Sequence, residues 1–171
     1  MKLEWMGNHR ALIEKMIKYG NAYSNTYKRQ FTYGTNILLT ASQIQTLEYI
    51  IEADDEDQKM SEMAERLGVS RSAFSKNVKN LAEKGLLEKY RLSGNRKDIY
   101  VKPSSEGYAL YQQYTEYILK ECFDDMFHIA NRIPESAKED FMVLLDRFSD
   151  TLIHFSAKKE TPQELVMMDE E

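Results

Sequence analysis

The 171-residue sequence is poor in residues that break regular structure, with 7 glycines and 3 prolines. These residues mark the many turns of an all-β fold, so their scarcity argues against one. The single cysteine, Cys122, excludes an intrachain disulfide framework, a cysteine-rich zinc site and an iron–sulfur cluster. No stretch approaches the roughly 18 consecutive apolar residues of a membrane span, and charged residues interrupt the first twenty positions. We therefore expect a cytoplasmic protein with no membrane partner.

The common enzyme motifs are also missing. The sequence has no Gly-x-Gly-x-x-Gly turn, no phosphate-binding loop ending in Gly-Lys-Ser/Thr and no Gly-x-Ser-x-Gly elbow. Its three histidines, His9, His128 and His154, do not stand at a metal-ligand spacing. We predict that the protein is not an enzyme and uses no metal and no cofactor. The alternative, which the missing motifs disfavour, is an enzyme that transforms a small molecule.

Charge is unevenly distributed along the chain. The formal net charge is −5, which taken alone argues against nucleic acid as a partner. Between Lys59 and Lys102, however, 11 Lys and Arg residues stand against 5 Asp and Glu residues, a balance of +6 that leaves −11 for the remaining 127 residues. A solvated, lysine-rich helix face would also account for such a block. Whether this basic block indicates binding to nucleic acid therefore depends on the sequence motifs inside it.

Hydrophobic periodicity predicts a chain that is mainly helical. Apolar and aromatic residues recur every three or four positions from about Ala11 to Phe31, and Gly34 closes that segment. Thr40 and Gln43 have the spacing of a capping box at the start of the next helix. That helix is expected to bury three residues: Ile44, Leu47 and Ile51. The acidic run 54–57 lacks an apolar period and is predicted to be a solvated loop.

Two short helices with clear ends follow. The first is expected to begin at a Ser61 cap and to end at Gly68, and its inward residues are Met63, Ala64 and Leu67. Ser70 caps the second, which ends at Gly85 and buries Phe74, Val78 and Leu81. Two helices joined by a short turn with a glycine predict a helix-turn-helix, whose second helix enters the DNA major groove.

The outward face of that second helix suits DNA. It presents only hydroxyl and cationic side chains, and no acidic residue occurs between Ser70 and Ala82. Cations neutralise phosphates, and hydroxyls bond to phosphates or base edges. The predicted DNA-contacting residues of this helix are Ser70, Arg71, Ser72, Ser75, Lys76 and Lys79. An exposed basic helix with no function is the alternative.

A β-hairpin is predicted after Gly85. Residues 86–91 and 98–102 have the pattern of two strands, and Ser93-Gly94-Asn95 supplies the turn between them. Cations at the tip, among them Arg91, can reach into the neighbouring minor groove. We predict Arg96 and Lys97 as DNA contacts of this wing, with a plain solvated hairpin as the alternative.

The stretch from Leu39 to Gly107 resembles the MarR family of bacterial winged helix-turn-helix transcriptional regulators. The resemblance rests on five motifs: Leu39-Thr40-x-x-Gln43, Met63-Ala64-x-x-Leu67-Gly68-Val69-Ser70, Ser72-Ala73-Phe74-Ser75-Lys76, Leu81-x-x-Lys84-Gly85-Leu86 and Val101-x-x-Ser104-x-x-Gly107. Two positions depart from the family pattern. Asn95-Arg96-Lys97 stands where the family commonly has Asp-x-Arg, which removes a charge and a planar guanidinium from the wing tip. Pro103 replaces the usual Leu before the hydroxyl residue.

Long helices flank this region. One is predicted to start at a Ser104 cap and to run to about Asn131, and a terminal helix starts near Pro134 with an apolar stripe. Four tyrosines spaced by three, Tyr108, Tyr111, Tyr114 and Tyr117, drift around the first of these helices, so some must meet a partner other than the local core. The resemblance implies that the first and last helices interlock as a homodimer that sets two recognition helices on a pseudo-palindromic operator.

We therefore expect a single winged-helix regulator over 1–171. Its DNA-binding lobe spans about 40–104, its dimerisation helices span about 1–35 and 105–157, and an acidic tail covers 158–171. The expected fold is mainly α with a small β-hairpin wing.

The resemblance further implies control by a small-molecule effector or by an oxidant at a cysteine. Acidic neighbours disfavour a thiolate at Cys122, so we predict a buried, unreactive cysteine. The tyrosine-rich segments are consistent with an apolar ligand pocket, but core and dimer packing explains them at least as well. The predicted function is a DNA-binding regulator, most simply a repressor. A winged-helix protein-interaction module without DNA binding is the alternative.

Overall fold

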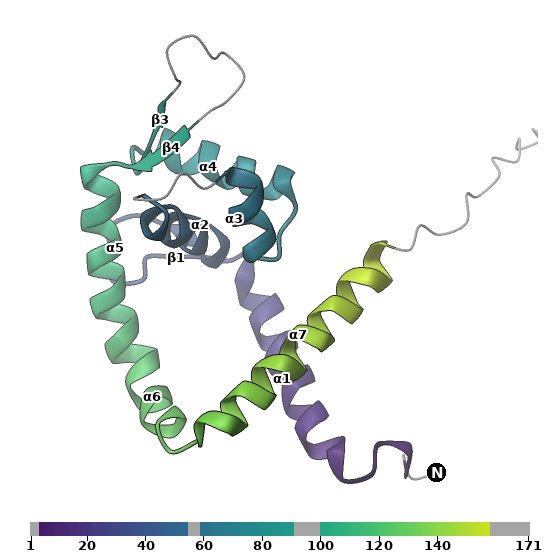
Figure 1. The fold of residues 1–171 in the computed structure, drawn as a ribbon. Coiled ribbons are helices and arrows are strands. Elements are labelled where there is room, and N and C mark those ends of the chain that lie inside the picture. The colour runs from purple at the N-terminus through teal and green to yellow at the C-terminus, as the bar shows by residue number, and fades with distance from the viewer. Residues whose placement is uncertain (1–3, 55–58, 91–99, 158–171) are drawn as a thin grey trace, which may run out of the picture. The chain divides into compact units, whose positions relative to one another are not determined.

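The computed structural model describes residues 4–54, 59–90 and 100–157 (Figure 1). These residues are mainly helical and include two small antiparallel sheets of two strands each. This confirms the predicted mainly α fold with a β-hairpin. The chain divides into two compact units, Met1–Cys122 and Phe123–Glu171. No described helix is both long and apolar enough to cross a membrane.

The first unit contains most of the secondary structure. Its elements in chain order are η1 (Glu4–His9), α1 (Arg10–Tyr27), β1 (Gln30–Phe31), β2 (Leu39–Thr40), α2 (Ala41–Glu52), α3 (Met60–Arg66), α4 (Arg71–Glu83), β3 (Leu87–Tyr90), β4 (Tyr100–Pro103) and α5 (Ser105–Ile118). A π-helical turn, η2 (Leu119–Phe123), continues α5. The second unit contains α6 (Asp124–Ala130) and α7 (Glu135–Ala157).

The first long helix is shorter than its apolar period predicts. It ends at Tyr27 rather than near Phe31, because Gln30 and Phe31 pair with Thr40 and Leu39 as an antiparallel sheet. The ladder uses backbone groups that a longer helix would need for its own hydrogen bonds. Over so short a segment, the spacing of apolar residues does not distinguish the last turn of a helix from a short strand.

The caps of the next two helices give one confirmation and one correction. The predicted capping box is present, since the Gln43 N–H donates to Thr40 Oγ1 and the Thr40 N–H donates to Gln43 Oε1. Ser61 is not the cap of α3, because the helix already begins at Met60. Its N-cap is Lys59, whose N–H donates to the Glu62 carboxylate at 3.2 Å, and this hydrogen bond moves the helix start.

One hydrophobic core holds this unit together. It is built on Leu39, Ile44, Leu47, Ile50, Met63, Phe74, Val78, Leu81, Leu86, Leu87 and Leu110. The three residues predicted for the buried face of α4 are all members. Ile51 and Leu67 are only partly buried and pack against the core. The core therefore fixes α4 against α2 and α3.

The residues predicted to form a helix from Ser104 to Asn131 fall into three helical elements: α5, the π-helical turn η2 and α6. Every residue of that turn is exposed, and Cys122 is one of them. The predicted burial of Cys122 is therefore wrong, because no core residue is contributed by the turn that carries it. In the second unit, α7 begins directly after Pro134 as predicted.

Candidate nucleic-acid interface

The turn between α3 and α4 is closed by backbone hydrogen bonds. The Gly68 N–H donates to the Glu65 carbonyl at 2.9 Å, and the Val69 N–H donates to the Ala64 carbonyl at 3.0 Å. This is the pairing of a Schellman motif, which requires a left-handed residue, and Gly68 has a φ of +70°. The predicted helix-turn-helix is therefore present with a fixed angle of entry into α4.

Both ends of α4 are also fixed as predicted. The Ser70 hydroxyl accepts from the Ala73 N–H at 3.2 Å and lies 3.0 Å from the Ser72 hydroxyl. At the other end, the Leu86 N–H donates to the Leu81 carbonyl across Gly85, whose φ is +75°. The Ser70 oxygen therefore serves as the helix cap and keeps one lone pair that can accept a further hydrogen bond.

The outward face of α4 carries the predicted residues. Arg71, Ser72, Ser75, Lys76 and Lys79 are all exposed, whereas Phe74, Val78 and Leu81 are buried. The Lys79 ammonium has one acidic neighbour, Glu83, at 3.8 Å on the next turn. The prediction from helical spacing places all five side chains correctly on the surface of the unit.

Two polar contacts that the sequence analysis missed hold the helix-turn-helix on α2. Asn77 donates from its side-chain amide to α2, at 2.7 Å from the Ser42 hydroxyl. Arg66 forms a bidentate ion pair with Glu52 at 2.9 and 3.0 Å, and its guanidinium lies 4.7 Å from the centre of the Tyr49 ring. The sequence signals these two contacts only weakly: each is made by a polar residue that stands beside the buried face of its helix.

The hairpin after α4 is formed by β3 and β4. Leu87 pairs with Pro103 at its base, and Tyr90 pairs with Tyr100 at the last described rung. The predicted strands are present, and at the base of the hairpin β3 begins at Leu87 rather than at 86 and β4 ends at Pro103 rather than at 102. The predicted wing contacts Arg96 and Lys97, together with Arg91 and the turn 93–95, lie outside the described residues.

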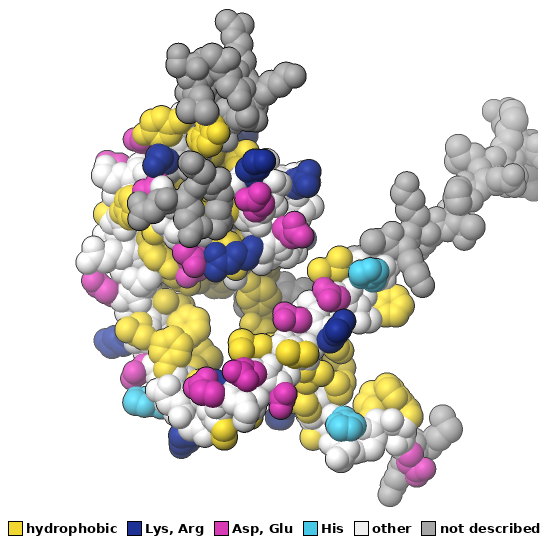
Figure 2. All heavy atoms as spheres, viewed as in Figure 1, with side chains coloured by type: hydrophobic (Ala, Val, Ile, Leu, Met, Phe, Trp, Pro, Cys, Tyr) yellow, Lys and Arg dark blue, Asp and Glu magenta, His cyan; other side chains and the backbone are white. Residues whose placement is uncertain are grey.

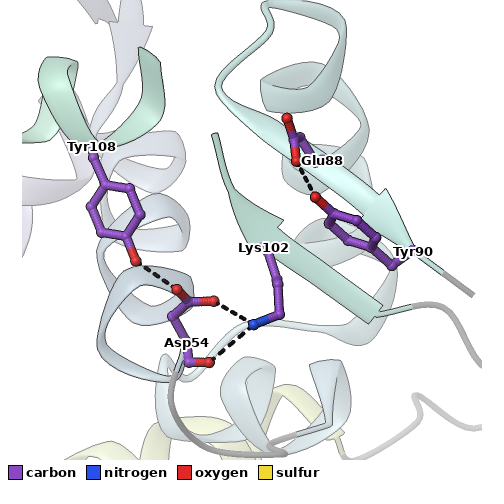
Figure 3. A network of polar contacts seen from close by, with 5 residues as sticks. All are labelled: Asp54, Glu88, Tyr90, Lys102 and Tyr108. Atoms are coloured by element: carbon purple, nitrogen blue, oxygen red, sulfur yellow. Dashed lines mark hydrogen bonds and ion pairs between the residues drawn. The ribbon is translucent and has the colours of Figure 1, made fainter. Parts of the chain in front are cut away.

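Asp54 connects the wing to two helices (Figure 3). Asp54 lies just beyond the end of α2, and its carboxylate accepts from the Tyr108 hydroxyl of α5 at 2.7 Å and from the Lys102 ammonium of β4 at 3.1 Å. The Tyr108 hydrogen bond and, after it, the Lys102 contacts lower the pKa of Asp54, although partial burial opposes them. Asp54 is therefore not the purely solvated loop residue that its acidic neighbours suggest. It ties the return strand of the wing to the body of the unit.

A second junction lies at the base of the wing. The Ser104 hydroxyl donates to the Gly85 carbonyl at 2.6 Å and accepts from the Gly107 N–H at 2.9 Å. Gly107 lies so close to the Leu86 carbonyl that an added Cβ would overlap it. The Val-x-x-Ser-x-x-Gly motif therefore locks the end of α4, the return strand and the start of α5 together.

The tyrosines of α5 find partners within this unit. Tyr111 donates to the Glu48 carboxylate of α2 at 2.7 Å, and Tyr114 packs edge-on against Tyr33. Burial raises the pKa of Tyr114 to about 12. Tyr117 lies against Gly34. These contacts support packing, rather than an apolar ligand pocket, as the role of the aromatic residues.

A helix-turn-helix followed by an antiparallel hairpin defines the winged helix-turn-helix class of protein. The family model that matches the chain is that of the MarR family, over residues 39–98. No curated relative matches the chain in sequence. Solved structures match it over most of its length.

Three of these structures are informative. ZitR of Lactococcus lactis in complex with DNA is 14% identical, with a TM-score of 0.60, covering 86% of this chain and 99% of its own. A mutant MarR from E. coli complexed with operator DNA is 18% identical, with a TM-score of 0.56 and coverage of 86% and 98%. The PcaV transcriptional regulator of Streptomyces coelicolor, in complex with its natural ligand, is 17% identical, with a TM-score of 0.56 and coverage of 86% and 96%.

The family model and the shared fold confirm the resemblance carried by the motifs between Leu39 and Gly107. The chain has the winged helix-turn-helix of MarR-family transcriptional regulators.

Proposed function

We propose that the protein is a sequence-specific regulator that binds double-stranded DNA through α4. The observation that carries the proposal is the exposed face of that helix, where Arg71, Lys76 and Lys79 alternate with hydroxyl side chains. Its contact residues are those predicted from the sequence: Ser70, Arg71, Ser72, Ser75, Lys76 and Lys79. The wing-tip residues Arg96 and Lys97 add minor-groove contacts.

The chemistry of this face divides into two tasks. The three cations neutralise phosphates, which provides affinity for any duplex and makes it depend on salt. The short hydroxyl side chains of Ser72 and Ser75 let the helix lie deep in the major groove and bond to base edges, which provides sequence preference. Titratable acids do not interrupt the face until Glu83.

The proposed regulator acts as a homodimer through its long helices, residues 1–35 and 105–157. Support comes from large apolar side chains that lie open on α6 and α7 (Figure 2). The exposed ones include Phe127, Ile129, Phe141, Leu145, Leu152 and Phe155. Large apolar side chains left open to solvent in this number mark an interface. A two-fold dimer would place two copies of α4 about one DNA turn, roughly 34 Å, apart on a pseudo-palindrome.

Repression with release by a small-molecule effector completes the proposal. A dimer that covers a promoter blocks transcription without any catalytic step, and a ligand that favours another spacing of the recognition helices releases it. The similar PcaV regulator is described with its natural ligand, and ZitR is described as zinc-responsive. These similarities support control by an effector but do not identify the molecule.

The test is fluorescence anisotropy of labelled duplex DNA from upstream of the protein's own gene, compared with a shuffled duplex of the same composition, across a salt series. Tight binding that prefers the native sequence and falls steeply with salt is expected. Equal, weak binding to both duplexes, together with a salt-insensitive complex with another protein, would instead support the protein-interaction module.

A further inference from the structure

Asn77 is the one residue of α4 whose side chain makes a set of hydrogen bonds to another helix among the described contacts. Its amide nitrogen lies 2.7 Å from the Ser42 hydroxyl, 3.2 Å from the Ser42 carbonyl and 3.0 Å from the Thr46 hydroxyl. All three acceptors belong to α2. Asn77 is half-buried and directly follows Lys76, so it lies at the border between the core and the exposed face.

The chemistry of these partners fixes which way the amide points. A carbonyl oxygen only accepts, so the NH2 group must face Ser42. The Thr46 hydroxyl donates its own proton to the Ser42 carbonyl at 2.8 Å, which leaves its oxygen lone pairs to accept from Asn77. Two N–H donors are thus shared among three acceptors, and the donor capacity of the amide is fully used.

These hydrogen bonds add a directional constraint on the rotation of α4 about its own axis to the packing of the core. Phe74, Val78 and Leu81 attach α4 through apolar burial, which is non-directional. Hydrogen bonds to Asn77 depend on distance and angle, and a shift of about 0.5 Å weakens them. At a side-chain radius of about 5–6 Å, turning the helix by about 20° moves its outer face by about 2 Å. Loss of these hydrogen bonds would therefore loosen the rotational position of the exposed face relative to α2.

We propose that Asn77 is a positioning residue that sets the rotation of the recognition helix and thereby its discrimination between DNA sequences. The inference rests on the proposed DNA-binding function. Lys and Arg reach phosphates through long, flexible side chains, so affinity for any duplex tolerates a small rotation. Base-edge contacts by the short side chains of Ser72 and Ser75 do not tolerate such a rotation. A hydrogen bond to one base is broken by a shift of a fraction of an ångström.

The experiment compares three changes in the full-length protein. Asn77→Ala removes the donor, and Ser42→Ala with Thr46→Val removes both hydroxyl acceptors on α2 while leaving the sequence of α4 intact. Asn80→Ala is the matched control: it makes the same chemical change one turn along α4, where no side-chain hydrogen bond to another element is described. A duplex selected in vitro by the unaltered protein and a shuffled duplex are titrated with each variant, and thermal unfolding is followed in parallel.

The expected result is a loss of about tenfold in the ratio of affinities for the selected and shuffled duplexes. It should occur in both test variants and not in the control, with the affinity for the shuffled duplex unchanged. A fall in thermal stability with an unchanged ratio would overturn the proposal, because it would make Asn77 a structural residue only. A loss confined to Asn77→Ala would also overturn it, since the α2 variant should act through rotation alone.

Two further outcomes keep the tests separate. If the double variant does not fold, Ser42→Ala alone removes the acceptor of the shortest hydrogen bond. This single variant should then show the loss in the ratio of affinities for the selected and shuffled duplexes. If the unaltered protein selects no preferred duplex, the proposed function fails first and this inference is overturned with it. A retained ratio in the variants of a protein that does select a sequence contradicts only the role of Asn77.

Discussion

The Lys79 ammonium lies 3.8 Å from the Glu83 carboxylate, one turn further along the exposed face of α4. Both side chains are well exposed, so the pair contributes little to the stability of the unit. It does place a negative charge beside one of the cations proposed to meet phosphate. DNA must therefore compete with Glu83 for Lys79.

Glu83→Gln is expected to raise the affinity for DNA by about twofold, the size of an exposed ion pair on one helix. Anisotropy titration of a labelled duplex measures it. In a Lys79→Gln background the same change should have no effect. An equal rise in both backgrounds would mean that Glu83 repels DNA directly and does not act through Lys79.

Gly107 is expected to tolerate no side chain. Gly107→Ala would force a Cβ against the Leu86 carbonyl, so the free energy of unfolding should fall by about 1–3 kcal/mol, the usual cost of overpacking. Urea unfolding measures the difference. Gly20→Ala is the control, because Gly20 lies inside α1 with nothing within 4 Å of the new methyl group, and alanine there should stabilise by up to about 1 kcal/mol. Equal effects at the two positions would contradict the close approach.

Asp54 should give the protein a pH-dependent contribution to stability. Its pKa in the folded protein is below the ordinary value of 3.8, so the charged form is the one that folding favours. The contribution is therefore present above pH 3.8 and disappears as the pH falls through the lowered pKa. Asp54→Asn should cost about 1 kcal/mol at about pH 6 and less at about pH 3.

Urea unfolding of both proteins at the two pH values tests this linkage. Tyr108→Phe removes the largest cause of the lowered pKa and should reduce the pH dependence without abolishing it. A difference between the Asn variant and the unaltered protein that stays the same at both pH values would show that the carboxylate is not stabilised by its partners.

The proposed dimer predicts different effects on two faces of α7. Leu152 is 57% exposed on the apolar stripe, and Leu152→Glu should dissociate the dimer because a carboxylate would be buried without a partner. His154 is two residues further along α7 and so lies on the side of the helix opposite Leu152, and His154→Glu should leave the dimer intact. Sedimentation equilibrium measures both. A monomer before any substitution, or a dimer unaffected by Leu152→Glu, would contradict the proposed interface.

Features that depend on neighbouring residues could be predicted from the sequence. The Thr40–Gln43 capping box, the left-handed Gly68 and Gly85 and the exposed face of α4 all follow from spacings of a few residues. Each is decided by backbone geometry within one helical turn. The helix-turn-helix is assembled from such local signals, which is why its residues could be placed.

Features that depend on distant partners could not be predicted. Asn77 meets Ser42 across 35 positions, and Lys102 meets Asp54 across 48. No periodicity records such a pairing, because it follows from how the helices pack. The exposure of Cys122 was also missed, because its acidic neighbours bear on the charge of the thiol and not on what covers it.

The most direct test of DNA binding by α4 is charge reversal at Arg71, Lys76 and Lys79. The chain supplies a matched control in the exposed Arg10, Lys15 and Lys18 of α1, which have the same residue types at the same spacing. Both triple variants change the net charge equally. Anisotropy titration across a salt series, with the oligomeric state checked in parallel, compares them.

Replacing Arg71, Lys76 and Lys79 by Glu is expected to lower DNA affinity by about a hundredfold or more and to lower the salt slope by about 0.9 for each phosphate that is no longer neutralised. Because α1 belongs to the proposed dimerisation helices, the α1 variant is compared as the dimer, and as the dimer it should retain nearly all of its affinity and slope. Equal reductions in the two variants, or an α4 variant that binds DNA as tightly as the unaltered protein, would contradict the assignment of α4 as the DNA-binding helix.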